Sequence, residues 1–183
     1  MSKKIGFFIG SLRKDSYTRK VAEAFSTLLP QGYEAVFIDL APLEMYNQDL
    51  DDQNTPTAAW TTFREQVKGV EALAFFTPEY NRSVPAVLKN ALDVGSRPYG
   101  QSVWDKKPGM VVSVSPGALS GFGANHHLRQ SLVFLNVPTL QQPEAYIGNI
   151  ANLQNEDGTI VKETMGFLQS ITDAFIAFAE ANS

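Results

Sequence analysis

The sequence contains no cysteine and no long apolar run. Without thiols, disulfides, thiolate nucleophiles and iron–sulfur ligation are excluded. No window approaches the roughly 18 apolar residues of a membrane span. The apolar stretch 5–9 is too short for a signal peptide and leads directly into a polar segment. We therefore expect a cytoplasmic protein, in which any redox chemistry is carried by a bound cofactor.

Positive charge is also in short supply. Fifteen lysines and arginines face 19 acidic residues, a net charge of −4, with a pI near 5.2. This balance gives no long-range attraction for nucleic acid or anionic membranes, so we expect neither as a partner. A hydrophobic share of 44% over 183 residues is typical of a folded protein. We expect one domain, residues 1–183, with a substantial core.

Apolar runs alternate with segments of helical spacing. The predicted strands cover residues 4–10, 34–40, 70–77, 110–114 and 139–146, of which the last is short and can be interrupted at Pro143. The predicted helices cover residues 21–29, 57–68, 85–96, 124–135 and 162–180. Right-handed crossovers then give a parallel sheet with helices on both faces. Five strands of this size suit the order 2-1-3-4-5, in which the loops after the first and third strands meet at the switch point.

The loop after the first strand has the composition of a phosphate site. Hydroxyls and a guanidinium gather at the entry to the first helix: Ser11, Arg13, Ser16 and Thr18. Helix N-termini leave free amides and carry a partial positive charge, which suits a phosphate dianion. The alternative interpretation is that Asp15 or Ser16 only caps the helix while Arg13 is solvated.

The loop lacks both familiar nucleotide motifs. Neither G-x-G-x-x-G nor G-x-x-x-x-G-K-[ST] is present there. Their absence argues against a Rossmann dehydrogenase and against a nucleoside triphosphatase. A terminal monophosphate is the natural ligand that remains.

Three motifs together carry a family resemblance: G-S-L-R-x-x-S at 10–16, T-P-E-Y-N-x-S-V-P at 77–85 and L-K-N-A-L-D at 88–93. In this order and at these spacings they resemble the NADPH-dependent FMN reductase family. Within that family the chain is most similar to the quinone- and chromate-reducing members. The similarity continues through residues 115–117 and 128–135, and so covers nearly the whole chain.

The resemblance implies a flavodoxin-like α/β fold that binds FMN without a covalent link. The first loop of the family holds the FMN phosphate, which implicates Ser11, Arg13, Ser16, Tyr17 and Thr18. The family's third loop lays its backbone along the edge of the isoalloxazine ring, which implicates Pro78, Glu79, Tyr80 and Asn81. The far side would be closed by Ser115, Pro116 and Gly117. Thr18 stands where members commonly have asparagine, and its hydroxyl can still donate a hydrogen bond.

The expected activity is two-electron transfer by a ping-pong mechanism, from NAD(P)H through FMN to quinones or other small acceptors such as chromate, azo compounds or free flavin. Hydride transfer needs aligned atoms rather than a protein nucleophile, so we name no catalytic side chain. A flavodoxin-type single-electron carrier is the alternative, but −4 is a mild charge for docking protein partners. Lys14, Arg82 and Arg97 are candidate partners for the 2′-phosphate of NADPH.

Several other polar side chains could be mistaken for sites. Asp49, Asp51 and Asp52 lack the glycine and terminal glutamate of a calcium loop, and we expect them in a solvated loop, 41–56. His126 and His127 are adjacent and cannot share one helix face. We expect no metal site. Tyr80 has an alternative interpretation as an ordinary buried aromatic.

The family resemblance also implies that the helix 85–96 packs against its symmetry mate, giving a homodimer. The segment after this helix is unusually apolar for a connection, since it contains Pro98, Tyr99 and Trp104. Exposed apolar side chains of this kind often mark an interface. The alternative is that Tyr99 and Trp104 cap the bottom of their own sheet. A tetramer is less supported, because the arginine and tyrosine that some relatives use for it in segment 123–126 are absent. We expect Lys89 and Asp93 to form an exposed ion pair.

Overall fold

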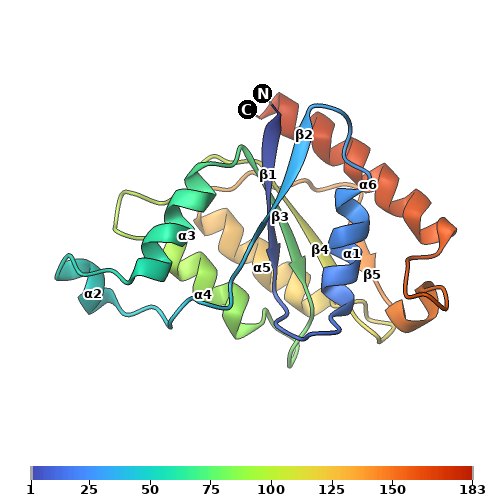
Figure 1. The fold of residues 1–183 in the computed structure, drawn as a ribbon, viewed down its shortest axis with the longest axis horizontal. Helices are drawn as coiled ribbons and strands as arrows, with labels where there is room; N and C mark the ends of the chain where they lie inside the picture. The colour runs from blue at the N-terminus through green and yellow to red at the C-terminus, as the bar shows by residue number, and fades with distance from the viewer. Residues whose placement is uncertain (1, 183) are drawn as a thin grey trace.

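Five parallel strands form the sheet of the computed structural model, which describes residues 2–182. They are β1 (Lys3–Ile9), β2 (Tyr33–Ile38), β3 (Ala72–Thr77), β4 (Gly109–Val114) and β5 (Ala145–Ile147). Their order across the sheet is β2-β1-β3-β4-β5 (Figure 1). This confirms the predicted flavodoxin-like topology, in which the first and third strands are neighbours.

Helices cover both faces of the sheet, as predicted. The main ones are α1 (Tyr17–Ser26), α3 (Ala58–Lys68), α4 (Ala86–Gly95), α5 (Phe122–Phe134) and α6 (Lys162–Ala181). α1 and α6 pack on one face, while α3, α4 and α5 pack on the other (Figure 1). Adjacent residues of β1 serve different faces, so that Phe7 joins the core under α1 and α6 and Phe8 joins the core under α3 to α5.

The fifth strand is shorter than the predicted 139–146. Thr139 makes only an isolated bridge to Gly109, and the Leu140 amide donates to the Gly109 carbonyl at 2.9 Å. Regular pairing with β4 resumes at Ala145. Pro143 lies between these points and has no N–H to donate to a ladder, which separates the bridge from the strand.

The segment 41–56 is not simply a solvated loop. It contains the short helix α2 (Gln48–Asp52). The carboxylate of Asp51 forms a two-pronged pair with the Arg64 guanidinium at 2.9 and 2.8 Å, and their side chains are only 4% and 8% exposed. Arg64 also donates from Nε to the Val94 carbonyl at 2.9 Å. The expectation of a solvated Asp51 is therefore wrong, because the side chain has a buried partner on α3.

Trp104 is a core residue and not part of an exposed patch. Its ring is fully buried, and its Nε1 donates to the Leu92 carbonyl at 3.0 Å. It packs directly on Gly95, where an added Cβ would lie 2.5 Å from ring atoms. The alternative interpretation is thus correct for Trp104. Tyr99, in contrast, is 89% exposed.

Two segments were not expected as helices: α2, and the 3-10 turn η1 (Ile150–Leu153). Among residues 2–182, no helix is both long enough and apolar enough to cross a membrane. The cytoplasmic location stays a prediction.

We predict that Asp51→Asn lowers the free energy of unfolding by about 3 kcal/mol, since it leaves the Arg64 guanidinium buried without a carboxylate. Asp52→Asn is the matched control, because Asp52 is exposed on the same short helix and should change stability by less than about 0.5 kcal/mol. Urea denaturation of both variants measures the difference. Equal losses in the two variants would contradict the assigned role of the buried pair.

Candidate functional site

A cavity of about 200 Å³ opens beyond the carboxyl ends of the central strands. The Gly10 amide donates to the Phe76 carbonyl at 2.8 Å, and beyond this bond the chains leaving β1 and β3 separate. Ten of the twelve residues expected from the sequence line the cavity, together with Val114. They are Ser11, Arg13, Ser16, Tyr17, Thr18, Pro78, Glu79, Tyr80, Ser115 and Pro116.

The first loop presents hydrogen-bond donors to this cavity. Ser11, Ser16 and Thr18 are buried at its wall. Ser16 is the N-cap of α1, and its Oγ accepts from the Arg19 amide at 3.2 Å. Helix geometry leaves the amides of Tyr17 and Thr18 without an intrahelical acceptor. Ser16 does cap the helix and Arg13 is exposed, as the alternative interpretation holds. The cap leaves the amides of Tyr17 and Thr18 able to donate to a ligand.

The carboxylate of Glu79 is turned toward other partners. Its Oε2 accepts from the Ala124 amide at 3.1 Å, and its Oε1 pairs with Arg82 at 3.0 Å. The side chain is only 10% exposed. The acidic residue of the cavity wall is thus compensated by a helix N-terminus and a cation, so the hydroxyls and amides keep the wall suited to an anion.

The second loop is a tight hairpin. The Tyr80 amide donates to the Ser83 carbonyl at 3.1 Å, and the Ser83 amide donates back to the Tyr80 carbonyl at 3.0 Å. Tyr80 is 48% exposed, so its interpretation as a buried aromatic is wrong. Asn81 lies at the turn with φ 52° and does not line the cavity.

The third loop folds back on its own residues. The Gly117 amide donates to Ser115 Oγ at 3.1 Å, and the Gly117 carbonyl accepts from the Ser120 amide at 3.1 Å. Gly117 is the other expected residue that the cavity lining lacks. Val114 lines the cavity but ends β4, where an apolar residue is indistinguishable in sequence from the rest of a buried strand.

A buried polar network below the third loop was not predicted. Ser113 Oγ donates to the Ser120 carbonyl at 2.8 Å and accepts from Asn125 Nδ2 at 3.4 Å. Asn125 Oδ1 in turn accepts from Arg129 Nε at 2.9 Å. Burial lowers the pKa of Arg129. This chain ties β4 and the loop to α5, and its members are scattered in sequence.

The two adjacent histidines diverge. His126 Nε2 lies 3.1 Å from the Tyr146 hydroxyl, whereas His127 Nδ1 lies 3.0 Å from Ser83 Oγ. Tyr146 donates to Glu144 at 2.8 Å, and burial together with this carboxylate raises the pKa of Tyr146 to about 12. Within residues 2–182, no three His, Cys, Asp or Glu side chains gather in a way that could hold a metal ion.

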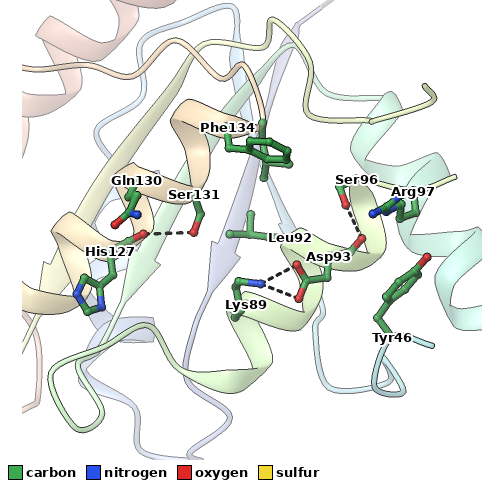
Figure 2. Close-up of a pocket in the computed structure, with 11 residues that line it drawn as sticks. Tyr46, Lys89, Leu92, Asp93, Ser96, Arg97, His127, Gln130, Ser131 and Phe134 are labelled. Carbon is green, nitrogen blue, oxygen red and sulfur yellow. Dashed lines mark hydrogen bonds and ion pairs between the residues drawn. The ribbon is translucent and has the colours of Figure 1, made fainter. Parts of the chain in front are cut away.

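A second hollow, of about 790 Å³, lies between α4 and α5 (Figure 2). Lys89 and Asp93 form the predicted exposed ion pair on α4, at 2.7 Å. His127 and Phe134 approach from α5 (Figure 2), and Phe134 is 89% exposed. We call this hollow the α4–α5 groove. The groove lies beside the hairpin of the second loop, because His127 lines the groove and also contacts Ser83 of the hairpin.

The sheet order and the cavity at its switch point define a flavodoxin-like protein. Residues 3–152 match the sequence profile of the family described as NADPH-dependent FMN reductase. The chain therefore belongs to this family of oxidoreductases.

Relatives agree with this assignment. The chain is 51% identical over 178 residues to a quinone reductase of Pseudomonas putida, covering 97% of this chain and 95% of that protein. It is 40% identical over 179 residues to a 2-hydroxy-1,4-benzoquinone reductase of a Burkholderia species, covering 97% of each. The structure of FerB, a flavoenzyme NAD(P)H:(acceptor) oxidoreductase from Paracoccus denitrificans, superposes with a TM-score of 0.91 at 33% identity over 98% of each chain.

These findings confirm the predicted family, its enzyme class and its cofactors, FMN with NAD(P)H as electron donor. They concern the family as a whole. Which side chains hold the flavin stays a prediction. The cavity shows only that most of the expected residues lie close together.

Proposed function

We propose that residues 1–183 form a single flavodoxin-like FMN-binding domain that transfers electrons from NAD(P)H to small quinones. One observation supports this above all: ten residues expected from three separate loops line one cavity at the switch point. The relatives named quinone reductase favour quinones as acceptors. Chromate, azo compounds and free flavin are further acceptors that a reactive flavin could reduce.

The first loop binds the FMN phosphate in this proposal. The hydroxyls of Ser11, Ser16 and Thr18 donate to its oxygens, the N-terminus of α1 supplies amides, and Arg13 adds a charge-assisted bond. Tyr17 completes this wall. All these groups can donate hydrogen bonds, so a dianion meets no negative partner among them.

The second and third loops border the ring. One edge of the ring is bordered by the backbone of the second loop, Pro78, Glu79, Tyr80 and Asn81. The opposite edge is closed by the third loop, Ser115, Pro116 and Gly117. When bound, FMN supplies the hydride chemistry. Pro78 has no N–H and the Tyr80 amide donates to the Ser83 carbonyl, so in this proposal the amides of Glu79 and Asn81 donate to an edge on which negative charge develops.

The cavity is smaller than the roughly 300–1,000 Å³ of sites that enclose a whole ligand. In this proposal the cofactor is only partly enclosed, and one face of the ring is open to donor and acceptor in turn. Lys14, Arg82 and Arg97 remain the candidate contacts for a 2′-phosphate. Arg82 is paired with Glu79, although its side chain is 69% exposed.

We predict that Arg13→Ala raises the dissociation constant of FMN about tenfold. An exposed charge-assisted contact belongs at the low end of the range of about 1.5–3 kcal/mol. Lys14→Ala is the control, because Lys14 is the exposed neighbouring cation and does not line the cavity. Flavin fluorescence titration of the apoprotein measures both. An unchanged dissociation constant in Arg13→Ala would contradict the proposal that this loop binds the FMN phosphate.

We predict ping-pong kinetics, with parallel double-reciprocal lines when NAD(P)H is varied at several quinone concentrations. Donor and acceptor share one open face, so excess quinone should inhibit competitively against the nicotinamide. Intersecting lines would show that both substrates bind together, and the shared-face proposal would then be wrong.

We also propose that a second copy of the chain covers the α4–α5 groove. Phe134, an exposed aromatic, lines the groove, so one surface of the chain offers both a hollow and an apolar side chain, as a self-complementary two-fold interface requires. Val133, also on α5, is 74% exposed, and Tyr99 follows α4 with 89% exposure. Large exposed apolar side chains often mark interfaces.

Phe134→Glu and Tyr99→Glu should each shift the protein from dimer to monomer in sedimentation at micromolar concentration, since a charge would be buried without a partner. Phe167→Glu is the control, because Phe167 is a partly exposed aromatic (38%) on α6, which packs on the other face of the sheet from α4 and α5. A wild-type protein that sediments as a fully active monomer would contradict the dimer.

A further inference from the structure

Glu79 caps α5, whose third residue, Ala124, lies 45 residues later in the sequence. The N-cap position of α5 is Gly121, which has no side chain and adopts a left-handed conformation with φ 73°. An N-cap side chain normally accepts from the second or third helical amide. Here that acceptor is Glu79 Oε2, which receives the amide of Ala124, the third residue of α5, at 3.1 Å.

The second turn residue of the hairpin, Arg82, is held in an unfavourable conformation. Asn81 and Arg82 have φ values of 52° and 64° between the paired residues Tyr80 and Ser83. Such two-residue turns favour glycine at the second position, and a long side chain in the left-handed region is disfavoured. Strain of this kind persists only where the surroundings over-determine the backbone.

Contacts from α5 provide this support. Besides the Glu79 bond, His127 Nδ1 lies 3.0 Å from Ser83 Oγ. Gly123 sits against the hairpin so closely that an added Cβ would lie 2.7 Å from the Arg82 carbonyl oxygen. Arg82 itself is tied to Glu79 Oε1. Glu79 therefore joins the start of the hairpin, its strained turn residue and the first turn of α5.

We propose that the Glu79 side chain is a positioning residue for the flavin loop, whose carboxylate clamps the hairpin 80–83 to α5. The inference rests on the proposed function, in which the backbone of this loop borders the FMN ring. Backbone amides act on a cofactor without reorganisation only if the backbone that carries them is fixed beforehand. The carboxylate thus acts through the backbone geometry and not by touching the reacting atoms.

The experiment uses the full-length protein with three substitutions at the clamp and one control. Glu79→Ala removes both acceptor oxygens. Glu79→Gln has nearly the same shape and keeps one oxygen for the Ala124 amide, while an NH2 group replaces the oxygen that pairs with the exposed Arg82. Gly123→Ala pushes on the Arg82 carbonyl. Glu71→Ala is the matched control. Its carboxylate accepts from the Lys4 amide at 2.6 Å, where β1 and β3 begin, at the end of the sheet away from the cavity.

Amide hydrogen exchange in the apoprotein is measured first, because it does not depend on flavin. Glu79→Ala and Gly123→Ala should speed exchange at the Tyr80 and Ser83 amides by about tenfold or more, while Glu79→Gln and Glu71→Ala should stay within about threefold of wild type. The dissociation constant of FMN should rise in the same two variants by about tenfold, and the glutamine should restore it.

Exchange in Glu79→Ala that matches Glu71→Ala would overturn the clamp, as would an FMN affinity that is lost equally in the control. A wild-type protein that binds no FMN would instead overturn the proposed function, and the exchange result would still decide whether Glu79 fixes the hairpin.

Discussion

The hydrogen bond from the Gly10 amide to the Phe76 carbonyl is the last one between the chains of β1 and β3, and the rest of the site depends on this pairing. Parallel strands send their loops to the same edge of a sheet, and neighbouring strands whose helices lie on opposite faces leave a crevice between them. α1 follows β1 on one face, and α4 follows β3 on the other. An added Cβ at Gly10 would lie 3.2 Å from Leu88 and Pro78, so little space is left for a larger residue.

Much of this arrangement could be predicted from the sequence, because its signals are local. The apolar runs of β3 and β4 are buried along their whole length, as expected for central strands of a doubly covered sheet. The hydroxyls at residues 11–18 and the hairpin at 80–83 gather at one cavity, because the sheet order brings their loops together. Their motifs also carried the family assignment.

What could not be predicted depends on partners far apart in sequence. Nothing near Asp51 indicates that its carboxylate meets Arg64 in the core. The sequence around Trp104 does not show that its ring packs on Gly95 and is buried. The bond from the Ala124 amide to Glu79 spans 45 residues, and a glycine-rich segment at 117–123 does not reveal that its helix lacks a cap of its own. In each case tertiary packing outweighs local propensity.

The most direct test of this account is an anaerobic titration of the purified protein with NADH and NADPH, followed by addition of a quinone. We predict a yellow protein whose flavin absorbance is bleached by one equivalent of at least one nicotinamide and fully restored by one equivalent of quinone. A colourless protein that binds no FMN on titration, or a bound flavin that neither nicotinamide reduces, would contradict it.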